Sequence, residues 1–272
     1  MVKIKCLSSF LIVLLLAGCQ KDTTTSTIAQ PGDMNTSEGS IIIGDKTFDA
    51  LNGFVFGQIS TSGLKSATLG TCPAVTATLN GSFPVSITFD WGTGCTGAED
   101  GITRSGKITA SVSGMMNMAS SVITFTFTDF VSEGNKISGV HRITYMGPNS
   151  ANSWPRYSVF TESRIEFPDK KFITYRAEYI RLHSEGSATP LIIADDVWRI
   201  EGRSTGTTRE GVNWTASYPS AVVKKASCKW FSSGSILVKP EGGTPSTIDF
   251  GDGACDNKAT LKTGDKTIDI QL

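Results

Sequence analysis

The sequence predicts an all-β protein, an antiparallel meander of long strands that curls into a barrel-like sheet or folds into a sandwich. Apolar and polar residues alternate with a period of two, as in strands with one buried face; clear examples are 123–130 (ITFTFTDF), 172–180 (FITYRAEYI) and 212–218 (VNWTASY). Turn-forming residues follow at hairpin spacing, at 132–136, 168–171, 207–211 and 262–266. No amphipathic helix longer than two turns is expected.

Residues 1–18 have the features expected of a cleaved signal peptide of the lipoprotein type. Lys3 and Lys5 make a short basic region, and residues 7–17 (LSSFLIVLLLA) make an apolar stretch that is too short to span a bilayer well. The stretch ends in Leu-Ala-Gly-Cys, which resembles the lipobox of bacterial lipoproteins. We therefore expect Cys19 to carry the lipid that anchors the chain to a membrane, since two or three acyl chains give stable anchoring.

Residues 19–40 contain the lipidated cysteine and a polar, Thr- and Ser-rich segment that is expected to be a flexible tether. Its start, Gln20-Lys21-Asp22, resembles the surface-export signal of lipoproteins from Bacteroidota. We expect an outer-membrane location with the surface favoured over the periplasmic face. Cleavage leaves 23 basic and 25 acidic residues, and this near-neutral balance argues against a nucleic-acid partner.

An internal repeat involves four of the six cysteines. The segments 86–95 (SITFDWGTGC) and 247–255 (TIDFGDGAC) share an Asp-aromatic-Gly-x-Gly pattern that leads to a cysteine. Each has another cysteine upstream, at the head of a strand-like segment, and each is followed by an expected turn and a final strand, in 104–112 (RSGKITASV) and 262–270 (KTGDKTIDI). The repeat units cover about 70–113 and 226–272.

Hairpin geometry selects the disulfide pairing. If Cys72 faces Cys95 across two antiparallel strands, the turn centres between residues 83 and 84, in NGSFP. If Cys228 faces Cys255, the turn centres between residues 241 and 242, in KPEGGT. Both segments have turn composition, so we predict the disulfides Cys72–Cys95 and Cys228–Cys255, which a periplasmic or surface location permits. Because no linker divides residues 41–272, we favour one elongated all-β domain over two separate domains.

Three aspartates near the C-terminus are weak candidates for a metal site. Asp249, Asp252 and Asp256 could supply carboxylate oxygens to calcium, but their spacing does not match an EF-hand loop. Glycine-kinked strand ends, at which aspartate caps a turn, explain them better. No metal or other cofactor is expected.

Other candidate residues have stronger structural than functional explanations. Gly202–Gly206 matches the G-x-S-x-G nucleophile elbow, but a strand pattern follows it where the elbow needs a helix. His141 and His183 lie alone in strand patterns, and the pairs Asp195-Asp196 and Glu99-Asp100 fit turn capping. Trp154 is the weak candidate for ligand binding, because it lies in an expected loop beside Pro155 and could stack on a glycan or peptide.

The segments 251–260 (GDGACDNKAT) and 224–234 (KKASCKWFSSG), together with the lipobox, resemble a group of uncharacterised lipoproteins from Bacteroidota. The resemblance implies an envelope location and a β-rich fold, and it supplies no catalytic residues. We therefore expect a non-enzymatic, surface-displayed envelope lipoprotein that acts as a binding or structural module, with an unidentified protein or glycan partner. The alternatives are a periplasm-facing carrier of an apolar ligand and a hydrolase with an unrecognised site.

Overall fold

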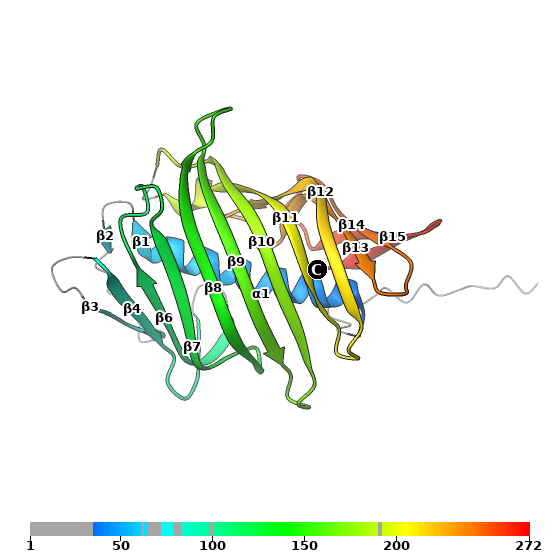
Figure 1. The fold of residues 1–272 in the computed structure, drawn as a ribbon, viewed down its shortest axis with the longest axis horizontal. Coiled ribbons are helices and arrows are strands. Elements are labelled where there is room, and N and C mark those ends of the chain that lie inside the picture. The colour runs from blue at the N-terminus through cyan, green and yellow to red at the C-terminus, as the bar shows by residue number, and fades with distance from the viewer. Residues whose placement is uncertain (1–34, 61–62, 65–71, 79–82, 98–100, 190–191) are drawn as a thin grey trace, which may run out of the picture.

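One large antiparallel sheet forms most of the molecule. The computed structural model describes residues 35–272, except 61–62, 65–71, 79–82, 98–100 and 190–191. The sheet has 14 strands in the order β16-β15-β14-β13-β12-β11-β10-β9-β8-β7-β6-β4-β3, with β5 paired to β6. Nearly every strand is therefore paired with its neighbour in sequence, which confirms the predicted meander (Figure 1).

The strands of this sheet, in chain order, are β3 (Ala74–Thr78), β4 (Val85–Asp90), β5 (Cys95–Thr96), β6 (Thr103–Val112), β7 (Val122–Ser132), β8 (Asn135–Pro148), β9 (Pro155–Glu166), β10 (Phe172–Glu185), β11 (Val197–Thr207), β12 (Asn213–Lys225), β13 (Phe231–Pro240), β14 (Ser246–Asp252), β15 (Lys258–Thr263) and β16 (Lys266–Gln271). A short 3-10 helix, η1 (Ile193–Asp195), precedes β11. The two-residue strands β1 (Ile59–Ser60) and β2 (Gly63–Leu64) form a separate small pair.

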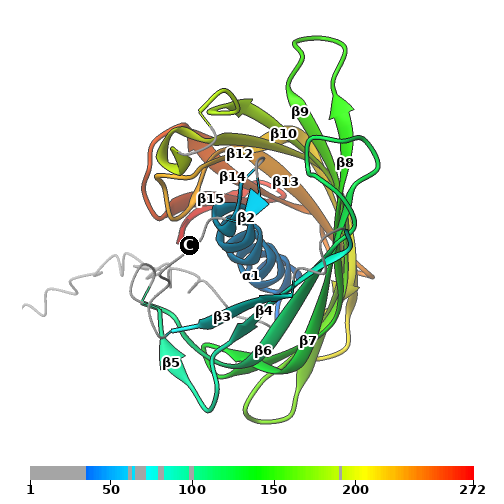
Figure 2. The same ribbon diagram turned by 90° about the vertical axis from the view of Figure 1, so that its left-hand side faces the viewer.

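The sheet is neither a sandwich nor a closed barrel. It curls around a 22-residue helix, α1 (Ser37–Gln58), which lies across the concave face of the strands (Figure 2). The edge strands β3 and β16 do not pair with each other. A curled sheet buries one face only if something fills its inside, and α1 does this with the buried side chains of Ile41, Phe48 and Leu51.

Helix α1 was not predicted from the sequence. Its glycines and its run of β-branched residues, Ile41 to Ile43, have low helix propensity, and its apolar residues do not form a clear stripe. The helix also moves the start of the folded domain, because Ser37 and Ser40 are buried within α1 rather than part of the tether. Within the described chain, no helix combines the length and the apolar character needed to cross a membrane.

The inward faces of the strands largely follow the predicted alternation. Ile123 and Phe125 on β7, and Ile173 and Tyr175 on β10, are buried. Val212 was expected to be buried with Trp214, but it is 40% exposed in the turn before β12. Alternation therefore identifies the buried face within a strand and misplaces a residue at the strand end.

Both predicted disulfides are present. Cys72 is bonded to Cys95 with a Cα–Cα distance of 5.9 Å, and Cys228 to Cys255 with 5.6 Å. The second hairpin has Ile236 opposite Ile248, so its turn centres on residue 242, close to the expected point. The first disulfide closes the β3–β4 end of the sheet and the second closes the β13–β14 hairpin.

The strands that follow the two hairpins are not equivalent, contrary to the predicted repeat. The segment 104–112 lies within the continuous strand β6, where Gly106 forms a bulge and not a turn. Gly106 has φ +77°, and a Cβ there would lie 2.2 Å from the carbonyl oxygen of Asp129, so the site requires glycine. The corresponding segment 262–270 forms the true turn between β15 and β16.

Candidate functional site

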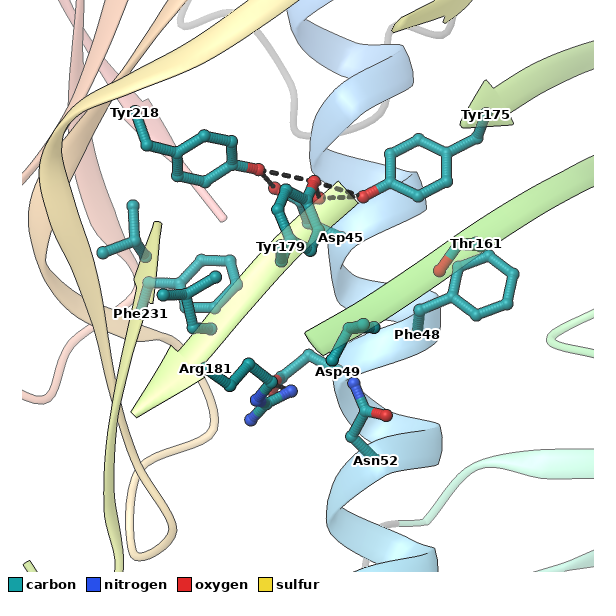
Figure 3. Close-up of a pocket in the computed structure, with 13 residues that line it drawn as sticks. Asp45, Phe48, Asp49, Asn52, Thr161, Tyr175, Tyr179, Arg181, Tyr218 and Phe231 are labelled. Atoms are coloured by element: carbon teal, nitrogen blue, oxygen red, sulfur yellow. Dashed lines mark hydrogen bonds and ion pairs between the residues drawn. The ribbon is translucent and has the colours of Figure 1, made fainter. Parts of the chain in front are cut away.

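A buried polar seam joins α1 to the sheet. Asp45, Asp49 and Asn52 are spaced at i, i+4 and i+7, so they lie on one face of the helix. Inward-facing residues of the strands meet them, as Figure 3 shows. We call the following residues the helix–sheet seam: Asp45, Asp49, Asn52, His141, Thr161, Tyr175, Tyr179, Arg181, Tyr218 and Lys224.

Three tyrosine hydroxyls surround the carboxylate of Asp45. Tyr175 and Tyr179 donate to Oδ1, the latter at 2.7 Å, and Tyr218 donates to Oδ2 at 2.8 Å. Burial raises the pKa of Asp45 to about 6, although the three hydrogen bonds oppose the increase. Burial, together with the charge of Asp45, keeps the pKa values of these tyrosines well above 10, so they remain hydrogen-bond donors.

Gly202 allows two of these tyrosines to meet. It lies on β11 opposite Tyr179, at a bulge in the pairing with β12. Gly202 has φ +150°, and a Cβ there would lie 2.2 Å from the carbonyl oxygen of Glu178. With no side chain between them, the rings of Tyr179 and Tyr218 pack edge to face, with centroids 5.1 Å apart.

Asp49 forms ion pairs with two cations. Arg181 Nη1 lies 3.1 Å from Oδ1, and Lys224 Nζ lies 3.1 Å from Oδ2. Burial alone would raise the pKa of Asp49, but the two cations outweigh it and hold the pKa below its usual value. With Asp45 ionised, two carboxylates and two cations balance inside the domain, which satisfies the requirement that buried charges be paired.

His141 completes the seam on β8. Its Nε2 lies 2.8 Å from Asn52 Oδ1 and its Nδ1 lies 2.8 Å from Thr161 Oγ1. These partners fit a neutral ring that donates from Nε2 and accepts at Nδ1. Burial, aided by the positive charge of Arg181, lowers the pKa of His141 to about 3, so the ring is a neutral structural hydrogen-bonding group at physiological pH.

Little free space remains in the seam. The cavity lined by Asp45, Asp49, Tyr179 and Arg181 has a volume of about 20 Å³, which is about enough for one water molecule. The Asp45 carboxylate is surrounded by hydroxyl groups rather than facing an open cleft. The arrangement therefore fixes the position of α1 against the sheet and offers no space for a substrate.

The three aspartates that the sequence offered as metal ligands do not form a site in the structure. Asp249 and Asp256 accept backbone N–H groups from Gly251 and Lys258, at 2.9 and 3.2 Å, as expected for turn capping. Asp252 is exposed at the end of β14. Among the described residues, no group of three or more His, Cys, Asp or Glu side chains is arranged to hold a metal ion.

The nucleophile-elbow motif does not form an elbow. Gly202–Gly206 lies within the continuous strand β11, and Ser204 is buried at 2% exposure. The second histidine, His183, pairs with Asp196 at 2.8 Å and stacks on Trp198. Asp196 thus binds a side chain instead of capping a turn, whereas Asp195 accepts a hydrogen bond from Thr189 at 2.6 Å.

Three other candidates remain: Trp154, Cys19 and the pair Glu99-Asp100. Trp154 is half-buried in the β8–β9 turn, where its backbone N–H donates to Asn149 Oδ1 at 2.9 Å. Cys19 and the pair Glu99-Asp100 lie outside the described residues. None of these three positions belongs to the seam.

One residue in the sequence, Arg181, does indicate a buried polar cluster. Arg181 has the same parity as Ile173, Tyr175 and Tyr179 on β10, so the strand alternation places a charged side chain on the buried face. A charge at such a position requires a buried partner. Without a predicted helix, no segment could supply that partner.

Comparison with known proteins gives no match to the chain among protein-family models, curated proteins or solved structures.

Proposed function

We propose that the chain is a lipid-anchored protein of the cell envelope, displayed at the surface through Cys19, and that it acts as a non-enzymatic binding or structural module. The observation that supports this proposal is the pair of disulfides, one in each of two hairpins. Stable disulfides are typical of oxidising compartments outside the cytosol. They agree with the signal peptide and lipobox of the sequence.

The seam supports a scaffold more than a carrier. An apolar carrier would use the concave face of the sheet, but α1 lies there and buries Phe48 and Leu51 against the strands. The polar seam leaves a cavity of about 20 Å³ at its centre. Partner binding is therefore assigned to the outer face and the loops.

Acyl labelling of cells tests the anchor. Wild-type protein should incorporate labelled palmitate and fractionate with membranes, and Cys19→Ala should lose the label. Cys6→Ala is the matched control, because Cys6 lies in the signal peptide and should leave labelling unchanged. An unlabelled wild type would overturn the anchoring proposal.

Protease treatment of intact cells tests display. Surface display predicts that added protease degrades the protein in intact cells, while a periplasmic marker survives. If cleavage occurs only after lysis, the protein faces the periplasm and the display proposal fails.

A further inference from the structure

The oxygen atoms around Asp45 lie closer together than their protons explain. Five contacts join the Asp45 carboxylate and the hydroxyls of Tyr175, Tyr179 and Tyr218, which we call the Asp45 oxygen cluster. Three of the contacts are hydrogen bonds to the carboxylate, and they use all three hydroxyl protons. The other two join hydroxyl oxygens, Tyr175 to Tyr179 and Tyr218 to Tyr179, each at 2.6 Å. Two close oxygen pairs therefore have no proton between them, and protonation of Asp45 would supply only one.

The neighbouring part of the seam has no such deficit. His141 donates one proton to Asn52 and accepts one from Thr161, so each of these contacts contains one proton. Contacts that only hold α1 against the sheet need no more than this. The excess of oxygen over protons at Asp45 indicates a position for a positive ion.

The spacing of the oxygens matches neighbouring positions in a metal coordination shell. An octahedral ion with bonds of about 2.0 Å holds neighbouring oxygens about 2.8 Å apart. Tyr179 Oη lies 2.7 Å from Asp45 Oδ1, and Tyr218 Oη lies 2.8 Å from Oδ2. The cavity of about 20 Å³ is lined by all four residues of the cluster, and it could hold a water molecule as a further ligand. A single ion fits where a substrate does not.

We propose that the Asp45 oxygen cluster binds one ferric ion through three tyrosine phenolates and the Asp45 carboxylate. Tyrosine is one of the ligands that hold iron in haem proteins. Magnesium and calcium instead take carboxylates, carbonyls and water. The inference goes beyond the proposed anchoring and display, and it holds whether or not Cys19 is acylated.

Binding of the ion leaves the charge of the seam unchanged. Each tyrosine breaks its O–H bond and forms an Fe–O bond, so three protons leave to water as one ferric ion enters, and no group is oxidised or reduced. The buried total stays at zero, because two carboxylates and two cations already balance in the seam. The exchange therefore creates no unpaired buried charge.

The ligands come from three elements that meet only in the folded domain. Asp45 lies on α1, Tyr175 and Tyr179 lie on β10, and Tyr218 lies on β12. Figure 3 shows the tyrosines approaching the carboxylate from different sides. Tyr179 and Tyr218 are half-buried, so part of each residue reaches solvent beside the cluster. The ion would bind the folded chain and not the unfolded one, so it should stabilise the docked helix.

Titration with ferric citrate tests the site. The mature chain, with both disulfides intact and freed of metal by a chelator, should bind one iron per chain that survives desalting. It should develop a visible absorption band from charge transfer between phenolate and iron. Resonance Raman spectra excited in that band should show tyrosinate vibrations. Calcium and magnesium should not displace the iron.

Substitution of two ligands should remove the site. Tyr179→Phe/Tyr218→Phe should lose most of the band and bind iron at least tenfold more weakly, since loss of even a supporting group around a metal has an effect of about this size. Tyr145→Phe is the matched control, because Tyr145 is also a buried tyrosine of the sheet but packs on Tyr157 outside the seam. Iron should raise the unfolding midpoint of the parent and the control but not that of the double variant. Thermal unfolding without metal checks that each variant folds.

The proposal is overturned if no iron remains on the parent chain after desalting, or if the folded double variant keeps the band. It also fails if calcium or magnesium at equal concentration displaces the iron, because the site is then not selective for a ferric ion. The spectra of the parent chain alone identify tyrosinate ligands, so the test does not depend on the folding of the double variant. None of these results depends on palmitate labelling or on protease access, so the anchor and the iron site are tested separately.

Discussion

Asp45 is a buried carboxylate that depends on three hydroxyl groups for its solvation. The tyrosines come from β10 and β12, and the acid comes from α1. Because these groups are buried together, the free energy of unfolding depends on the protonation state of individual side chains in the seam. Two of these side chains, Asp45 and His141, respond to pH in opposite directions.

Asp45→Asn should change the pH dependence of stability. The pKa of Asp45 is about 6 in the folded protein against an ordinary 3.8, so the folded state holds the proton more tightly. The contribution of Asp45 to the wild-type free energy of unfolding is therefore largest at low pH, and it is lost as the pH rises from about 4 to 6. The free energy of unfolding of Asp45→Asn relative to wild type should therefore rise by about 2 kcal/mol between pH 4 and pH 7. Urea unfolding across this range measures the change, and a constant difference would contradict it.

His141→Gln should show the reverse dependence. The folded pKa of His141 is about 3 against 6.5, so the unfolded chain takes up the proton first. Stability from neutral His141 is complete above pH 6.5 and is lost as pH falls toward 3. Relative to His141→Gln, wild type should lose about 2 kcal/mol between pH 7 and pH 5. The same urea series detects this effect, and parallel curves for the two proteins would disprove it.

Asp49→Ala should be strongly destabilising, because it leaves Arg181 and Lys224 buried without their carboxylate. We expect a loss of about 3–5 kcal/mol in the free energy of unfolding. Glu210→Ala is the control, since it breaks the exposed ion pair with Lys171, and its unfolding midpoint should hardly move. Equal effects of the two substitutions would mean that the seam does not stabilise α1.

At the scale of elements, α1 shows why the sequence predicted the sheet but not its filling. Strand alternation on β7 and β10 is set by local side-chain spacing, so a single sequence reveals it. Helix α1 is determined by distant contacts, such as those of Phe48 with Tyr175, and its own propensity is poor. The seam was missed for the same reason, because its acids lie on the helix that was not predicted.

Gly44→Ala separates helix propensity from packing. Propensity alone predicts a gain of about 1 kcal/mol, since alanine favours helix. However, a Cβ at position 44 would lie 2.2 Å from the Tyr175 ring, so we expect a loss of about 1–3 kcal/mol from overpacking. In the background of Tyr175→Leu the loss should shrink, and thermal or urea unfolding of the four proteins measures the coupling. A stabilised Gly44→Ala protein would show that α1 is not tightly packed here.

At the scale of the whole molecule, the open sheet has two edges and a disulfide in each terminal part. Cys72–Cys95 fastens the edge strand β3 to the sheet, whereas Cys228–Cys255 lies between strands with partners on both sides. The cysteine spacing was sufficient to predict the pairing. The spacing did not predict that β6 has a bulge at Gly106, whereas the corresponding segment of the second repeat forms the turn between β15 and β16.

Removing either disulfide should lower the free energy of unfolding by a similar amount, but should change hydrogen exchange in different strands. Cys72→Ala/Cys95→Ala and Cys228→Ala/Cys255→Ala open loops of similar length, so each should cost about 3 kcal/mol. Backbone hydrogen exchange should accelerate first in β3 when the first disulfide is removed, because β3 has one neighbouring strand. Strands β13 and β14 should stay protected longer in the second variant. Equal local protection in the two variants would contradict this assignment.

The position of α1 also has a consequence for folding kinetics. Neighbouring strands can pair in sequence order with short loop closures, whereas Asp45 must find Tyr218 across 173 residues and Glu38 must find Ser246 across 208. Contacts between residues so far apart in the chain form slowly, because the entropy of closing the loop is lost before the contact contributes any free energy. Helix α1 is synthesised before the strands, but we expect it to dock last. Its binding surface exists only after strands β10 to β14 have paired.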